Sequence, residues 1–456
     1  MSDNQGSAFL RVLPTVEERR IWHAIAAQYY EKKANYLDAA IHWYEADEII
    51  VCVELLIAYY RLIVDAGRIA ELYAFREKLT KAALQEEQIW ARFKIAMGRA
   101  ALIAEDFETA IKEFTEALKV NHPLLKGQAF YYRAKAYSKT RLPDALSSYW
   151  RGIELIQPYV NDSTEYRNLY IDLQIGLAWL YVQENENLAE AQKSLLAAQA
   201  ILQADDFTRQ CDLENAWARF CSKQKDSEGE LKHRFRAWMA AHETEDKELI
   251  IKTAINLAHS YLRANRQEFP LEYIQEAVAI ARQIGHRHWE AKCHEVIGSW
   301  HYFEKAYGEA IHHYKIADKV YHEIGNENWL GWNYFNLAEA YAELRENDSN
   351  GQARLYFKKA TQYALEVGAG DLMAKLDGLT GHFPWIKSEL TEDEIKILGF
   401  VQNHGVISNR QCRSLLNIAQ STAEHLLQSL AKKGTLIWNG KKGPAYGYLL
   451  NDSSKE

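Results

Sequence analysis

Small and aromatic residues recur at a fixed interval along the chain. Four positions return together 35 residues later, namely Ala110, Phe114, Ala117 and Pro123 as Ala145, Tyr149, Gly152 and Pro158. Small residues allow two antiparallel helices to approach closely where they cross, and an aromatic ring fills the gap beside the crossing. The pattern therefore predicts pairs of helices that pack one pair on the next.

Further copies extend this array in both directions. An early and a middle copy contain Ala27, Ala39, Trp43 and Ala46, and Gly176, Trp179, Ala191 and Ala198. Later, Ile284-Gly285 returns 40 residues on as Ile324-Gly325, and Val367-Gly368 follows after 43 more. An alanine-rich bundle of unrelated helices is the alternative, but it does not account for the shared intervals. We predict about eight to ten helix pairs over residues 17–375, with residues 205–247 the least regular part.

This joint recurrence resembles the tetratricopeptide repeat. The 40-residue copies are similar to the variant found in bacterial signalling regulators and polarity adaptors. The resemblance implies an all-α superhelical solenoid with a concave groove lined by the first helix of each pair. The residues expected to face the groove are mainly cations and hydrogen-bond donors, which suit an acidic or carboxylate-bearing peptide, unless they only solvate the surface. They are Arg92, Arg99, Lys135, Lys252, Asn256, His259, Arg263, Lys292 and Trp332.

The pattern changes after the array. Four glycines between 368 and 381, followed by Pro384, predict a linker at 376–389. Three helices follow, the second beginning at Ser408 and the third after the turn 417–419, and then two short strands in "TLIWN" and "YGYLL". This order predicts a small winged helix-turn-helix domain over residues 390–451, with short tails at 1–16 and 452–456.

The predicted C-terminal domain resembles the small winged helices of bacterial Fic-type and helicase-like proteins. The matching residues are Ile407, Ser408, Asn409, Arg410, Arg413, Leu415, Thr422 and Ala423. Where that pattern has two arginines, this chain has Gln420 and Ser421. The DNA-binding candidates are Arg410, Arg413, Gln420, Ser421, Thr422, His425, Lys441 and Lys442. Six cations stand against one acid between 405 and 450, so DNA binding by this domain and docking on a protein both remain open.

Composition limits the remaining possibilities. The chain of 456 residues has seven prolines and a net charge of -8, which argues against a protein that wraps nucleic acid along its whole length. Its five cysteines form no C-x-x-C pair, so we expect buried thiols rather than disulfides or zinc ligands. The polar start and the absence of an 18-residue apolar stretch lead us to expect a cytoplasmic protein.

Candidate chemistry is sparse. Histidines concentrate between 286 and 322, where His294 and His301 lie on one helical face and His312 could approach from the next helix. A metal site needs three converging ligands, and imidazoles also serve as packing residues, so we assign no metal. The segment "GTLIWNGKKG" has neither the spacing nor the Ser or Thr of a phosphate loop. We therefore expect no enzymatic activity and no cofactor.

The architecture resembles the sensor portion of bacterial signal-transducing (STAND-type) NTPases such as the maltose-regulator class, without the NTPase module. We expect a signal-responsive regulator or adaptor that binds a protein, peptide or effector in its groove and contacts DNA through the winged helix. The resemblance also implies a separate NTPase or effector as a partner. The alternative is a protein-binding scaffold or an accessory subunit of a larger complex, including a defence complex. The oligomeric state is left open.

Overall fold

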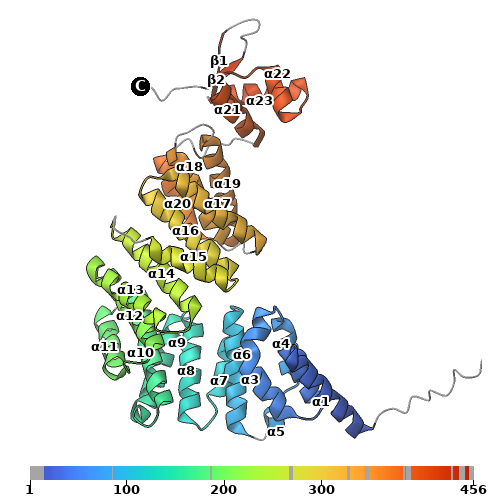
Figure 1. Ribbon diagram of the computed structural model, residues 1–456, viewed down its shortest axis with the longest axis vertical. Coiled ribbons are helices and arrows are strands. Elements are labelled where there is room, and N and C mark those ends of the chain that lie inside the picture. The colour runs from blue at the N-terminus through green and yellow to red at the C-terminus, as the bar shows by residue number, and fades with distance from the viewer. Residues whose placement is uncertain are drawn as a thin grey trace, which may run out of the picture. The chain divides into compact units, whose positions relative to one another are not determined.

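The computed structural model describes residues 15–84, 86–184, 187–266, 271–325, 329–344, 349–383, 386, 392–432, 435–440 and 447–450. The chain forms two compact units, Met1–Ala240 and Ala241–Glu456 (Figure 1). Of the two predicted tails, only Thr15 and Val16 fall within the described residues. No described helix is both long enough and apolar enough to cross a membrane.

Unit 1 consists of helices connected by short turns. In chain order they are α1 (Val16–Lys32), α2 (Tyr36–Glu45), α3 (Ile49–Asp65), α4 (Ile69–Arg76), α5 (Lys81–Leu84), α6 (Glu87–Ile103), α7 (Phe107–Ala117), α8 (Pro123–Tyr137), α9 (Leu142–Ile156), the 3₁₀ helix η1 (Gln157–Tyr159), α10 (Thr164–Glu184), α11 (Leu188–Ile201), α12 (Phe207–Lys223) and α13 (Ser227–His242), whose last turn crosses into the second unit.

Unit 2 continues the helix pairs and ends in a small mixed module. Its further helices are α14 (Lys247–Arg263), α15 (Glu272–Gln283), α16 (Arg287–Phe303), α17 (Tyr307–Glu323), α18 (Leu330–Leu344), α19 (Ser349–Val367) and α20 (Gly370–His382). The C-terminal module contains α21 (Glu392–His404), α22 (Asn409–Leu416), α23 (Gln420–Lys432), β1 (Leu436–Trp438) and β2 (Tyr448–Leu450). The predicted all-α repeat architecture is confirmed.

The small and aromatic positions pack as the sequence pattern predicts. A Cβ added at Gly98 on α6 would lie 2.5 Å from the Phe114 ring on α7, so only glycine permits this crossing. Gly298 on α16 and Tyr314 on α17 repeat the arrangement, with an added Cβ 2.7 Å from the tyrosine ring. Sixteen residues separate the two members in both pairs, because each pair of helices has the same length of turn.

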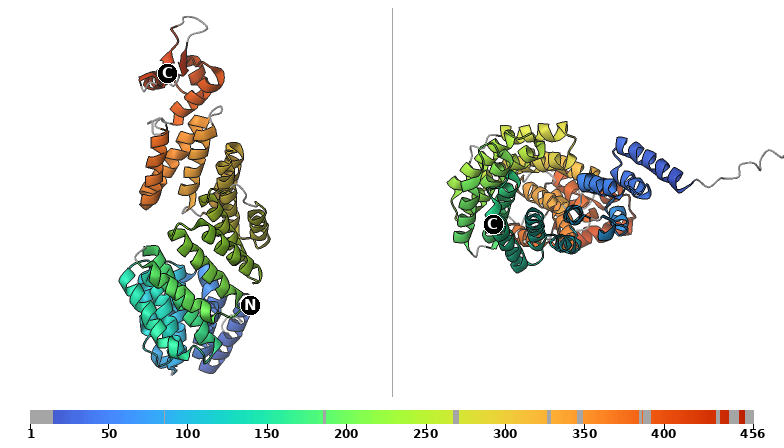
Figure 2. Two further views of the ribbon diagram at one scale, coloured as in Figure 1. Left: turned by 90° about the vertical axis from the view of Figure 1, so that its left-hand side faces the viewer. Right: turned by 90° about the horizontal axis from the view of Figure 1, so that it is seen from below.

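The helices of unit 1 form two layers. From α3 onward, the first helix of each pair contacts the first helix of the next pair: α3 with α6, α6 with α8, α8 with α10 and α10 with α12. The second helices pack mainly on their own partners and on the following first helix. The right-hand view of Figure 2 shows these helices following an arc, and the mutual contacts of the first helices place that layer on its inner side.

Left-handed residues close the tight turns between helices. Glu105 between α6 and α7, Lys225 between α12 and α13, and Lys305 between α16 and α17 have φ of 57°, 62° and 63°. Lys225 belongs to residues 205–247, which we expect from the sequence to be the least regular part of the array. The structure shows a short turn there, and α12 and α13 form a regular helix pair.

The expected linker is helical over much of its length. Helix α20 spans residues 370–382 and buries Leu372, Leu376 and Leu379, so an irregular segment from residue 376 is not found. Gly378 and Gly381 lie on the open side of this helix, where an added Cβ would meet no atom within 4 Å. The packing of three leucines outweighs a cost of about 1 kcal/mol for each helical glycine. The division between array and C-terminal module remains a prediction.

The C-terminal module has three helices followed by a two-stranded antiparallel sheet. Residues Leu436, Ile437 and Trp438 pair with Leu450, Leu449 and Tyr448. Its core contains Ile397, Val401, Ile407, Cys412, Leu427 and Leu430. Ser408 begins α22 as predicted, since its Oγ accepts a hydrogen bond from the Gln411 amide at 3.3 Å while the Gln411 side chain accepts one from the Ser408 amide at 2.9 Å.

Candidate ligand and nucleic-acid surfaces

A row of charged residues crosses the inner layer of unit 1. Arg99 on α6, Lys135 on α8, Asp172 on α10 and Arg209 on α12 follow one another at intervals of 36, 37 and 37 residues. These intervals match the repeat, so the four side chains occupy the same position on four successive first helices. Because those helices contact one another in order, the residues form one continuous polar row.

Aromatic rings hold the cations at one end of this row. The Arg99 guanidinium lies over the rings of Tyr60 and Tyr132, at 5.1 and 4.9 Å from their centroids. The Lys135 ammonium lies 5.3 Å from the centroid of Tyr131. Such cation–π contacts fix the position of a charge without neutralising it. Both Arg99 and Lys135 remain exposed.

A rigid ion pair forms the other end of the row. Arg209 donates from Nε and Nη2 to the two Asp172 carboxylate oxygens, at 2.9 and 3.0 Å. Its Nη1 also donates to Asp206 Oδ2 at 3.1 Å. About a quarter of each Asp172 and Arg209 side chain is exposed. Burial nevertheless raises the pKa of Asp172, an effect that outweighs the hydrogen bonds from Arg209.

Asp212 lies one helical turn beyond Arg209, and the charges of Lys135 and Arg209 only partly offset the cost of burying its carboxylate. The surrounding helices raise the pKa of its carboxyl to about 6, mainly through desolvation and further through the Asp172 charge. Desolvation likewise lowers the pKa of Lys135, although Asp212 and Asp172 oppose that shift. Among the described residues neither Lys135 nor Asp212 forms an ion pair.

Lys135 and Asp212 combine exposure with strong desolvation. Both side chains retain contact with solvent, yet protein groups surround each of them closely enough to shift its pKa. Both residues lie on first helices of unit 1, and we name them together the Lys135–Asp212 site.

The structure places the predicted groove residues in different environments. Arg99 and Lys135 lie in the polar row, whereas Arg92 is held by Glu54 through two hydrogen bonds of 2.6 and 2.9 Å. The sequence reasoning missed the acidic half of the row, Asp172 and Asp212, and also Arg209. The 36- to 37-residue interval between these charged residues is nevertheless present in the sequence.

The other six predicted residues lie in unit 2, on α14, α16 and α18. Lys252 is 3.2 Å from Glu248 and lies over the ring of Trp289. Lys292 is 3.0 Å from Glu295 and 4.1 Å from the centroid of Trp329. Both lysines therefore form ion pairs with a glutamate of their own helix. Asn256, His259 and Trp332 are half-buried, and Arg263 donates to the Ser260 hydroxyl at 2.9 Å.

The histidine cluster differs in one member from the sequence expectation. His313, rather than His312, meets His294, with their Nδ1 atoms 3.0 Å apart, and it also stacks on His301. Residue 313, one position further along α17, is the one that faces α16. A pocket of about 270 Å³ borders these three rings. Among the described residues no three His, Cys, Asp or Glu side chains converge as metal ligands would.

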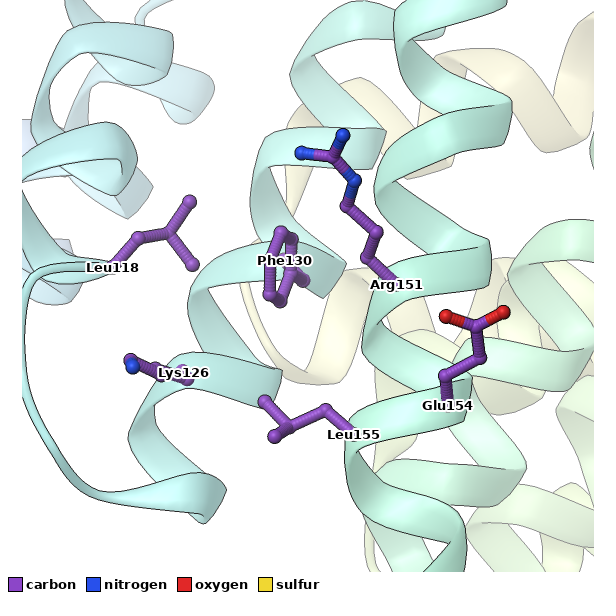
Figure 3. A pocket seen from close by; sticks show the side chains of 6 residues that line it. All are labelled: Leu118, Lys126, Phe130, Arg151, Glu154 and Leu155. Atoms are coloured by element: carbon purple, nitrogen blue, oxygen red, sulfur yellow. The ribbon is translucent and has the colours of Figure 1, made fainter.

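A second, shallower pocket lies beside α7, α8 and α9. Figure 3 shows Leu118, Phe130 and Leu155 facing it, with the Arg151 guanidinium at one side and Lys126 at the other. Its volume is about 460 Å³. The lining offers apolar contact, two cations and the carboxylate of Glu154.

The predicted DNA-binding residues of the C-terminal module that the structure describes are exposed. Arg410 and Arg413 on α22, and Gln420, Ser421, Thr422 and His425 on α23, are all exposed. Asn409 donates to the Gln420 carbonyl at 3.2 Å and so joins the starts of both helices. Arg410, Arg413 and Gln420 border a shallow pocket of about 600 Å³, which Glu424 also lines. Lys441 and Lys442 lie outside the described residues.

Comparisons with known proteins identify the fold. No protein-family model matches the chain, and no curated protein matches it. Among solved structures, it is similar to a signal transduction ATPase with a tetratricopeptide repeat sensor from Pyrococcus horikoshii (TM-score 0.50, 17% identity), covering 93% of this chain but only 55% of that protein. The apo form of RapI matches with TM-score 0.50 and 17% identity over 75% of this chain and 99% of its own.

The apo quorum sensor NprR from B. thuringiensis is a third match, with TM-score 0.50 and 15% identity over 78% of this chain and 98% of its own. Identities this low show the fold alone. The chain is an all-α protein of the tetratricopeptide-like superhelical repeat class. Two of these three neighbours are described as sensors.

Proposed function

We propose that the chain is a non-catalytic regulator or adaptor that binds an extended peptide at the Lys135–Asp212 site of unit 1. The observation that carries this proposal is a desolvated cation and a desolvated carboxylate that lack ion-pair partners within the described residues. Desolvated charges cost folding free energy, and a ligand that supplies the missing partners recovers it.

The chemistry of the row narrows the ligand class. Lys135 requires a carboxylate, and Asp212 requires an ammonium or guanidinium group. A peptide supplies both charges and a backbone that can follow consecutive first helices. This ligand keeps the carboxylate expected from the sequence and adds a cation, because the row contains acids as well as cations.

The test is a selection of random peptides by the full-length chain, followed by affinity measurements on the selected peptides. We expect them to carry one cation and one carboxylate at a constant separation. Lys135→Met and Asp212→Asn should each weaken binding about ten- to a hundredfold. Lys112→Met, on the exposed side of α7, is the matched control and should bind as the native chain does. Selected peptides that bind the Lys135→Met, Asp212→Asn double variant equally well would refute the proposal.

For the C-terminal module we propose a winged helix that contacts DNA through α22 and the start of α23. Its element order and the strand pairing that follows α23 support this assignment. Gln420, Ser421 and Thr422 are exposed at the start of α23, where hydrogen-bonding side chains read base edges in such folds. Arg410 and Arg413 would supply phosphate contacts.

DNA binding is tested by titrating the full-length chain against mixed-sequence duplex DNA at two salt concentrations. Arg410→Ala with Arg413→Ala should weaken binding to all sequences and reduce the salt slope by about two. Lys441→Glu with Lys442→Glu should act in the same direction. Gln420→Ala should instead relax the preference at one base position. Binding that is undetectable at about 100 μM protein and 100 mM salt would exclude this role.

One observation favours protein docking as the second candidate for this module. Leu415 on α22 and Ile437 and Trp438 on β1 are exposed, with about two-fifths of each residue accessible. Exposed large apolar side chains suit a protein partner better than a phosphate backbone. A separate NTPase or effector subunit is such a partner, and co-purification followed by mass spectrometry would identify it.

A further inference from the structure

The first helix of the array has an uncovered apolar face. Helix α1 contacts α2 and buries Ala27 on that side. On the opposite side Ile21, Trp22, Ile25 and Tyr29 are 51%, 59%, 61% and 57% exposed. At 3.6 residues per turn these four positions share one face. In a repeat array the preceding pair covers this side of a first helix, and α1 has no preceding pair among the described residues.

Charges bound this stripe symmetrically. Glu18 and Lys32 lie on the same helical face as the stripe, each seven residues from Ile25. Ile21 and Tyr29 lie four residues to either side of Ile25. An antiparallel pairing of two copies of α1 centred on Ile25 therefore sets Glu18 against Lys32 of the second copy. It also sets Ile21 against Tyr29 of the second copy.

We propose that α1 is a homodimerisation surface, in which two copies pair antiparallel about a two-fold axis at Ile25. The equal distance of an acid and a base from the centre is what a self-complementary surface requires, whereas a different partner would not impose it. A parallel pairing would place Glu18 against Glu18 and Lys32 against Lys32. The face is thus complementary to itself in the antiparallel direction alone.

The charged groups near the stripe differ in how far other residues engage them. Arg20 points away from it and forms an ion pair with Asp47 at 2.5 Å. Glu18 Oε2 accepts the capping hydrogen bonds from Thr15, at 2.7 and 3.0 Å, which fixes its carboxylate at the helix start. Lys32 has no ion pair among the described residues. A single helix from each copy buries less than the roughly 1,200 Å² of a standard interface, so we expect a dissociation constant in the micromolar range.

The experiment is sedimentation equilibrium of the full-length chain from about 1 to 200 μM. We expect a reversible monomer–dimer equilibrium. Glu18→Lys and Lys32→Glu should each weaken self-association about tenfold or more, because the two-fold axis applies each change twice. An equimolar mixture of these two variants should associate again, since opposite charges then face each other at both contacts. Lys112→Glu on α7 is the charge-matched control and should leave the equilibrium unchanged.

Ile25→Asp provides a variant that leaves the helix cap intact, and circular dichroism verifies the fold of each chain. We expect Ile25→Asp to be monomeric throughout the concentration range. A native chain that stays monomeric at 200 μM would overturn the proposal. So would single charge variants that dimerise as the native chain does, or a mixture that associates no better than its components. A native monomer that dimerises only after removal of residues 1–13 would identify that segment as the occupant instead.

Discussion

Replacing Asp212 by asparagine should stabilise unit 1. The pKa of this carboxyl is raised from 3.8 to about 6, so the folded state disfavours its ionised form. A raised carboxyl pKa means that folding free energy is lost as the pH rises from about 4 to 6. Above about pH 6 this loss of folding free energy, relative to a carboxyl with an unshifted pKa, reaches its full value of about 3 kcal/mol. The side chain also contacts solvent, and we halve this figure to about 1.5 kcal/mol.

The pH dependence distinguishes this cause from a general effect of the substitution. The same two pKa values give an expected gain of about 1.5 kcal/mol at pH 7.5, about 0.8 at pH 5 and about 0.3 at pH 4. The assay is amide hydrogen exchange of peptides from α10 and α12, because repeat arrays open locally. Asp205→Asn, an exposed neighbour, is the control and should stay within about 0.5 kcal/mol.

Two results would refute this reasoning. One is an Asp212→Asn chain that is no more stable than the native chain at pH 7.5. The other is a gain that does not shrink as the pH falls, which would show that ionisation is not its origin. A confirmed gain together with loss of peptide binding would mark Asp212 as a residue kept for binding at the expense of stability.

Three further predictions concern packing, turns and domain division. Gly98→Ala should destabilise unit 1 by about 1–3 kcal/mol, because the added methyl group collides with Phe114. Gly308→Ala, at an open position of α17, is the control and should not destabilise unit 2. Urea titrations of both variants check this prediction. Lys305→Gly should raise the melting temperature by relieving a left-handed lysine, a gain of about 0.5–1 kcal/mol, and an unchanged or lower value would contradict it. Limited proteolysis should cut first between α20 and α21, and a first cut within the helix pairs would contradict the proposed division.

The repeat architecture could be predicted because packing itself imposes the spacing. Gly98 and Phe114 must meet in every such pair, so the contact leaves a recurring trace in the sequence. Helix α20 was missed for the opposite reason: its glycines suggested a linker, while the three leucines that hold it acquire meaning only against neighbouring helices.

The sequence predicts some of the residues that occupy the candidate site, but not which of their charges are paired within the protein. Arg99 and Lys135 follow from their position on the first helices, but which charges are already neutralised depends on partners distant in sequence. Arg92 and Glu54 are 38 residues apart, and Arg209 and Asp172 are 37 apart. The sequence therefore did not show that Arg92 is paired internally, whereas Lys135 and Asp212 form no ion pair with the residues that the structure describes.

The regular interval of the polar row sets a length scale for any ligand that follows it. Neighbouring helices pack about 8–10 Å apart, so the three steps from α6 to α12 cover about 27 Å. An extended peptide advances about 3.3 Å per residue, and about eight residues would span this distance. Neighbouring first helices would then contact peptide residues that are two or three positions apart. A substitution on one helix would change the preference at one place along the ligand and leave its neighbours unaltered, so specificity could change one repeat at a time.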